Sequence, residues 1–91
     1  MQRIKLKIYG KVQGIFFRSS AKDKAEDLGL VGWVRNALDD AVELLAEGKP
    51  EKIKELVKWC KVGPQMAQVD KVEEKIENID RIEFLDFRIE Y

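Results

Sequence analysis

At residues 10–18 the chain reads GKVQGIFFR, and the patterns on either side of this stretch decide the fold. Before it, the apolar residues Ile4, Leu6 and Ile8 alternate with basic ones, a period of two that predicts a half-buried strand. After it, apolar residues recur at helical spacing. The stretch is therefore predicted to be a glycine-bearing loop that leads from a strand into the amino end of a helix.

This loop has the features of an anion-binding site. Gly10 and Gly14 give the backbone freedom at positive φ and let a ligand approach the main chain closely. The amides from about Gly14 to Arg18 precede a helix, where unpaired N–H groups and the helix dipole favour an anion. Arg18 adds a planar cation suited to phosphate oxygens. On spacing alone, the same residues equally fit a tight turn followed by a solvated arginine, because strand–glycine loop–helix elements are common.

Composition narrows the class of protein. A chain of 91 residues predicts a single domain, residues 1–91, with one core. Because 17 Lys and Arg balance 17 Asp and Glu, the sequence fits neither a disordered chain nor a general nucleic-acid binder. No apolar run approaches 18 residues and the amino-terminal residues lack a signal-peptide core, so we expect a cytoplasmic protein that binds no membrane. A monomer is the default expectation.

Two residue types limit the chemistry. There is no histidine, so a metal site would need carboxylates alone and the usual acid/base residue is missing. We therefore expect no metal and no cofactor. The one cysteine, Cys60, lies on the apolar stripe of a predicted helix and has no base partner, which favours core packing over catalysis.

Periodicity and turn residues predict two helices and five strands. The helices are expected near residues 20–28 and 50–62, and the strands near residues 3–9, 31–38, 42–46, 69–76 and 85–91. Ser20 with Asp23 resembles a capping box, which places the first helix start near Ser19 or Ser20. Val69 and Val72 are out of phase, which predicts a bulge or a late start in the fourth strand.

This element order indicates a fold class. Strand–helix–strand–strand–helix–strand, with a final strand, is typical of an α+β, ferredoxin-like two-layer sandwich. We expect an antiparallel sheet of about five strands with two helices on one face, because each helix and each strand has one apolar side. The fold alone says nothing about function.

Two longer patterns resemble a known family. GKVQGIFFR resembles the acylphosphatase signature G-x-V-Q-G-V-x-F-R, with Ile15 in the valine position. The segment GWVRN at residues 32–36 resembles the second signature of that family, with Asn36 four residues after the glycine. Glu47-Gly48 and Gly63-Pro64 also occur where the family has such pairs. The resemblance covers about residues 4–89.

The resemblance implies a fold, a reaction and a site. The family has a ferredoxin-like sandwich and hydrolyses an acyl phosphate to a carboxylate and inorganic phosphate without a metal or cofactor. The roles it implies fall on Arg18, which binds the phosphoryl group, and on Asn36, which holds the attacking water. The loop amides that it implies as phosphate ligands belong to Gly14, Ile15, Phe16, Phe17 and Arg18.

The sequence departs from the family pattern at three places, one of which is Ala37, where some members have a hydroxyl residue. Phe16 occupies a position that is often small, and it could narrow the pocket or point to the core. The turn after Asn36 has Asp39-Asp40-Ala41 where a glycine is common. We favour a changed hairpin turn, because aspartate tolerates the left-handed conformation. The other interpretation is a negative charge that weakens substrate binding.

Other functions stay open at this point. One is a related domain that acts on carbamoyl phosphate within a large multidomain protein. Another is a non-catalytic ferredoxin-like module that binds a small anion or RNA, although the predicted strands lack the aromatic pairs and the basic face of RNA-binding members. A degenerate acylphosphatase that keeps the anion site without turnover is the last.

Overall fold

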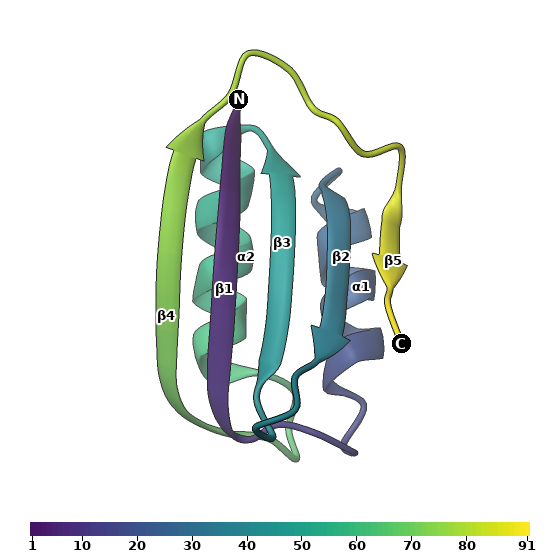
Figure 1. Cartoon of the computed structure of the whole chain (residues 1–91), viewed down its shortest axis with the longest axis vertical. Helices are drawn as coiled ribbons and strands as arrows, with labels where there is room; N and C mark the ends of the chain where they lie inside the picture. The colour runs from purple at the N-terminus through teal and green to yellow at the C-terminus, as the bar shows by residue number, and fades with distance from the viewer.

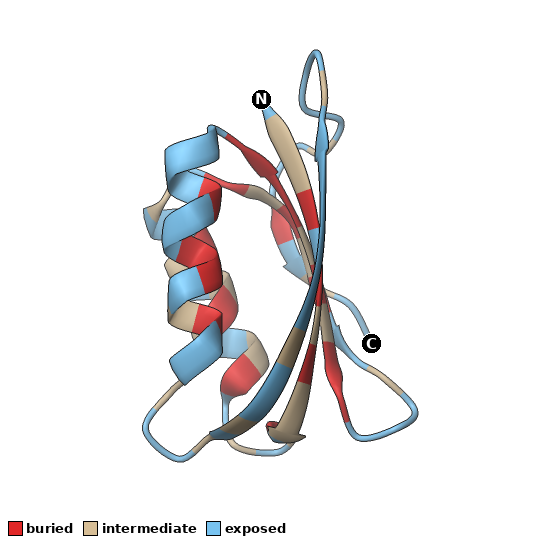
Figure 2. Ribbon diagram, turned by 90° about the vertical axis from the view of Figure 1, so that its left-hand side faces the viewer, coloured by how far each residue is buried: buried red, intermediate tan, exposed pale blue.

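The computed structural model describes all 91 residues and shows two layers, a five-stranded sheet and two helices that cover one of its faces (Figure 1, Figure 2). The elements follow the order β1 (Gln2–Lys11), α1 (Phe17–Asp27), β2 (Val31–Asn36), β3 (Val42–Gly48), α2 (Pro50–Val62), β4 (Gln68–Asn78) and β5 (Phe87–Ile89). The ferredoxin-like two-layer class is therefore confirmed. Neither α1 nor α2 has the length and apolar character that a membrane-spanning helix needs.

The sheet is mixed, so the expectation of a wholly antiparallel sheet is wrong at one edge. The strand order is β4-β1-β3-β2-β5, and only the β2–β5 pair is parallel. After β4 the chain crosses the end of the sheet that holds the N-terminus, and β5 then runs in the same direction as β2 (Figure 1). At three residues, β5 is also shorter than its sequence pattern predicts.

The core lies between the sheet and the helices, where the buried residues of Figure 2 gather. Alternation on β1 places Ile4, Leu6 and Ile8 fully inside, as predicted. Helix α2 contributes the expected stripe at helical spacing, and α1 contributes small alanines that let it lie close to the sheet. The buried stripe residues are Ile53, Leu56, Val57 and Cys60 on α2, and Phe17, Ala21 and Ala25 on α1. Each fully buried large aliphatic side chain contributes about 1.5–3 kcal/mol to folding.

Helix α1 begins earlier than the sequence predicts. Its first residue is Phe17, and its N-cap is Phe16, which has a left-handed φ of 65° and no side-chain cap. Both the amide of Ser20 and the hydroxyl of Ser19 donate to the carbonyl oxygen of Phe16. The predicted capping box at Ser20 is therefore wrong. The ring of Phe17 packs at 5.5 Å from that of Trp59, which fixes the first turn on the core and makes Arg18 the second helical residue.

The predicted irregularity in β4 is confirmed. Tyr9 pairs with Lys71 and Gly10 pairs with Val69, so Asp70 is the extra residue of a bulge. A Cβ added at Gly10 would collide with the carbonyl oxygen of Gln68 on β4. Gly10 therefore permits the close approach of two strands, whereas the sequence suggested that it admits a ligand.

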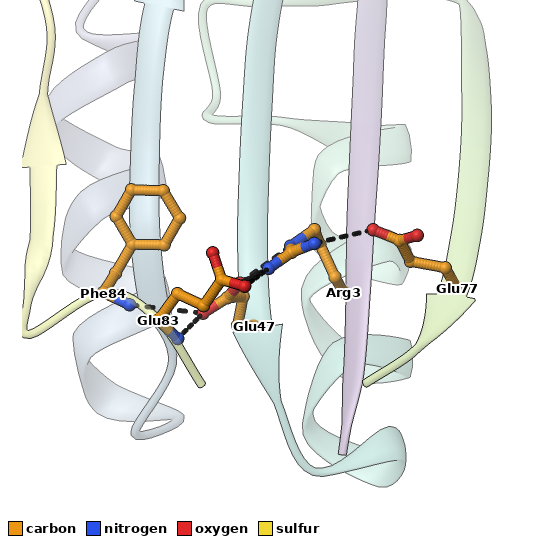
Figure 3. A network of polar contacts seen from close by, with 5 residues as sticks. All are labelled: Arg3, Glu47, Glu77, Glu83 and Phe84. Atoms are coloured by element: carbon orange, nitrogen blue, oxygen red, sulfur yellow. Dashed lines mark hydrogen bonds and ion pairs between the residues drawn. The ribbon is translucent and has the colours of Figure 1, made fainter. Parts of the chain in front are cut away.

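A buried carboxylate anchors the connection between β4 and β5, as Figure 3 shows. Glu47 on β3 has no exposed surface. Its Oε1 accepts hydrogen bonds from the amides of Glu83 at 2.6 Å and Phe84 at 3.3 Å, and its Oε2 accepts one from Nε of Arg3 at 2.7 Å. Arg3 also pairs with Glu77 at 2.8 Å. This network holds the crossing segment against the sheet and so fixes where β5 begins.

Candidate active site

A hollow of about 290 Å³ lies at the amino end of α1. Its lining includes four of the residues that the sequence predicts as ligands, and Arg18 is the only one with a charged side chain. The lining residues are Val12, Gly14, Phe16, Phe17, Arg18, Ser19, Ile89 and Tyr91. The last two come from β5 and the segment after it, and no sequence signal pointed to them.

The main chain of this hollow favours an anion. Helix geometry leaves the first amides of α1 without an intrahelical acceptor, and the first helical bond is that of Ser20. The positive end of the helix dipole adds to these amides. Gly14 has a φ of 75°, and a Cβ placed on it meets no atom within 4 Å, so the main chain is open to a ligand there. A phosphate-sized anion would find N–H donors on this side of the hollow.

The side chain of Arg18 supplies the charge. Its guanidinium carbon lies 5.2 Å from the ring centroid of Tyr91, a cation–π contact. None of the ion pairs in the structure involves Arg18. Its positive charge is therefore not neutralised by a carboxylate, and none of the side-chain hydrogen bonds in the structure occupies its guanidinium donors.

The two loop residues between Gly14 and the helix have different surroundings. Ile15 is half-buried, packs against the core and does not line the hollow. Phe16 lines the hollow with 81% of its surface exposed. Of the two orientations that the sequence allowed for Phe16, the one toward the core is therefore wrong.

Asn36 lies outside this hollow. It is the last residue of β2, pairs with Val42 of β3 and is exposed. It lines a second, shallow hollow of about 490 Å³ with Lys7, Ala37 and Asp39 among its neighbours. The two hollows share no lining residue. The β2–β3 hairpin and the loop before α1 nevertheless lie at the same end of the molecule (Figure 1).

A residue that sequence reasoning did not single out joins these two parts. Nε2 of Gln13 donates to the carbonyl oxygens of Ala37 and Ala41, both at 2.9 Å. Ala37 directly follows Asn36, and its own amide donates to Ala41 at 2.8 Å to close the hairpin turn. Gln13 therefore fixes the loop of Arg18 relative to the strand end of Asn36. The one feature of the sequence that could have pointed to Gln13 is its long amide side chain within the loop at residues 10–18.

The unusual hairpin turn has a structural explanation. Asp40 has a φ of 67° and so takes the left-handed conformation that a glycine often supplies. Asp39 pairs with Lys7 at 2.7 Å, and this pairing lowers the pKa of Asp39 and raises the pKa of Lys7. Asp40 lines neither hollow. The favoured interpretation, a changed hairpin turn, agrees with this geometry.

Neither Cys60 nor a group of metal-ligating side chains forms a reactive site in this structure. Cys60 is fully buried, and burial raises the pKa of its thiol to about 12, so the thiol stays protonated and unreactive at neutral pH. The core-packing prediction for Cys60 is confirmed. No three His, Cys, Asp or Glu side chains converge in the arrangement that a metal ion requires.

The family model and the similar curated proteins agree on one family. The acylphosphatase family model matches residues 4–89. An acylphosphatase of Marinobacter nauticus is 48% identical over 88 residues, which is 97% of this chain and 95% of that protein. The crystal structure of an acylphosphatase from Bacillus subtilis superposes with a TM-score of 0.93 at 30% identity, and each chain is covered completely. Full-length HypF in its phosphate- and nucleotide-bound form is also similar, with a TM-score of 0.88 and 25% identity over 99% of this chain and 12% of that one.

Proposed function

The chain belongs to the acylphosphatase family, and we propose that Arg18 and the loop amides hold the phosphoryl group while Asn36 orients the attacking water. The reaction of the family converts an acyl phosphate and water into a carboxylate and inorganic phosphate. The observation that carries the proposal is the hollow at the amino end of α1, where an unpaired Arg18 lies beside open main-chain donors.

These groups match the demands of the transition state. Phosphoryl transfer spreads charge over the phosphoryl oxygens, so positioning and electrostatic stabilisation dominate. The water oxygen bonds to phosphorus as the bond from phosphorus to the acyl oxygen breaks. The carboxylate departs with that electron pair, and because a carboxylate is a stable leaving group it needs no general acid. The proton lost by the water passes to a phosphoryl oxygen.

Asn36 suits the second role. Its amide offers an acceptor and two donors that orient a water but is too weakly basic to deprotonate it. The two hydrogen bonds of Gln13 hold the turn that follows Asn36 against the loop that precedes α1. We therefore propose that a water held by Asn36 reaches a phosphoryl group held at Arg18.

The first test is hydrolysis of benzoyl phosphate by Arg18→Ala. Loss of one preorganised donor costs about 10²–10³ in rate, and Arg18 also carries charge, so turnover is expected to fall by at least that factor. Arg81→Ala, an exposed arginine without an ion pair, is the matched control and should keep wild-type rates. Turnover like the wild type in Arg18→Ala would refute the assignment.

The second test separates water from phosphate. Asn36→Ala is expected to lower kcat while the inhibition constant of inorganic phosphate stays nearly constant, and Asn78→Ala at the exposed end of β4 is the control. If only phosphate binding weakens, Asn36 is a ligand and the water role is wrong. Activity that survives a chelator would support metal-independent hydrolysis. Phosphate binding without turnover would instead support a degenerate, non-catalytic anion-binding module.

We also propose that the protein works as a cytoplasmic monomer that binds neither nucleic acid nor membranes. The balance of 17 basic and 17 acidic residues supports the expected lack of binding to nucleic acids and membranes, because electrostatic binding to polyanions needs a basic excess. Analytical ultracentrifugation at micromolar concentration should give a single species of about 10.6 kDa. A stable dimer would contradict the monomer.

A further inference from the structure

Phe16 combines strain with exposure. Its φ of 65° and ψ of 20° lie in the left-handed region, which a bulky side chain rarely adopts and where glycine or asparagine is favoured. Burial does not offset this strain, because 81% of the residue is exposed. The neighbouring Phe17, by contrast, is buried in the core. Packing within the chain therefore does not explain the aromatic ring at position 16.

The ring of Phe16 lies at the wall of the hollow at the amino end of α1. Phe16 and Tyr91 are both exposed aromatic residues that line the hollow of Arg18. Val12 and Ile89 add apolar surface, and the lining contains no second cationic side chain and no Asp or Glu side chain. A volume of about 290 Å³ exceeds the roughly 150 Å³ of a cavity that accommodates benzene. A phosphoryl group at Arg18 therefore leaves room for one ring or a short apolar chain.

We infer that Phe16 forms one wall of the acyl subsite, so that the enzyme prefers aromatic or other apolar acyl groups over acetyl and over acyl groups with a second carboxylate. This inference rests on the proposed placement of the phosphoryl group at Arg18. An acyl group bonded to that phosphate cannot move far from Arg18 and the loop amides, and the ring of Phe16 is one of the two exposed aromatic surfaces in that hollow. A second carboxylate would find no cation among the lining residues other than Arg18.

The test compares two substrates in matched variants. Phe16→Asn removes the ring but tolerates the left-handed backbone, Phe16→Tyr keeps the ring, and Leu85→Ala shortens an exposed apolar residue outside the hollow. The measured quantity is kcat/KM for benzoyl phosphate divided by kcat/KM for acetyl phosphate. The inhibition constant of inorganic phosphate, measured in parallel, reports on phosphate binding by Arg18 and the loop amides.

The ratio is expected to fall about three- to tenfold in Phe16→Asn, the range that one aromatic contact contributes. It should stay near the wild-type value in Phe16→Tyr and Leu85→Ala. An unchanged ratio in Phe16→Asn would overturn the inference and leave the proposed function intact. If the inhibition constant of phosphate in Phe16→Asn rises by the same factor by which the ratio falls, the inference is also overturned. The ring would then act on phosphate binding and not on the acyl group. A wild-type chain that hydrolyses neither substrate would overturn the proposed function and this inference together.

Discussion

Replacing Glu47 should destabilise the fold strongly, although Glu47 lies at the opposite end of the molecule from the hollow at the amino end of α1. Both of its carboxylate oxygens act as acceptors. One faces Arg3 at 2.7 Å, and the other faces the amides of Glu83 and Phe84. Glu47→Ala leaves these part-buried donors without their acceptor.

The magnitude follows from those contacts. Removing one partner of a buried ion pair costs about 3–5 kcal/mol. Arg3 keeps its contacts to Glu77 and Glu83, so the lower end of that range applies to Glu47→Ala, about 3 kcal/mol. The unfolding entropy of a domain of this length is about 0.19 kcal/mol/K, so Tm should fall by about 15 °C.

Glu47→Gln sharpens the test. A glutamine has one acceptor and one donor group, so it can satisfy Arg3 or the amides of residues 83 and 84 but not both sides. We expect it to lose about 2 kcal/mol. Glu77→Gln is the control, because Glu77 is 59% exposed and a surface ion pair is worth about 0–1 kcal/mol.

Urea denaturation followed by circular dichroism measures these free energies, and hydrogen exchange locates the loss. The amide of Glu90, which donates to the carbonyl oxygen of Val34 at 2.8 Å, should exchange faster in Glu47→Ala, because β5 is no longer held at its start. A loss below 1 kcal/mol in Glu47→Ala would refute this account of the network. A stability of Glu47→Gln equal to that of the wild type would show that the carboxylate charge is not required.

Three further outcomes are expected. Gln13→Ala removes two hydrogen bonds between the loop and the hairpin, so urea denaturation should show a loss of about 2 kcal/mol, and Gln13→Glu, which lacks the donor, should not restore it. Lys7 lowers the pKa of Asp39, so the pair stabilises the folded state above the unfolded pKa of that carboxyl and this contribution disappears as pH falls through the folded pKa. An NMR titration should find the pKa of Asp39 below the usual aspartate range, and Lys7→Ala should raise this pKa back into that range. Because burial raises the pKa of Cys60 to about 12, a thiol reagent should label this residue only after denaturation, and rapid labelling of the native protein would contradict the packing.

Much of the fold was predictable because each element carries a local pattern. The alternation at Ile4, Leu6 and Ile8 and the helical stripe from Ile53 to Cys60 both report which side is buried. The direction of β5 was not predictable, because it depends on the connection anchored by Glu47. That anchor needs a tertiary contact, and a glutamate in an alternating strand carries no sign of it.

The site was predictable in part. Arg18 and Gly14 lie in one hollow, as the signature loop indicates. The early start of α1 was missed because Phe17 packs on Trp59 from a distant helix, and a tertiary contact of this kind overrides the local capping pattern. The contribution of Tyr91 was missed for the same reason, since its position follows from the parallel pairing of β5 with β2.

Strand β4 is an edge of the sheet, with β1 as its single neighbour. Its outer main chain offers a row of N–H and C=O groups on which a strand from another molecule could add, a common route to aggregation. Six of its eleven residues are charged, namely Asp70, Lys71, Glu73, Glu74, Lys75 and Glu77. The bulge at Asp70 also interrupts the regular spacing of that row. The same irregularity that shifts the register inside the sheet thus helps to keep concentrated protein from assembling through its free edge.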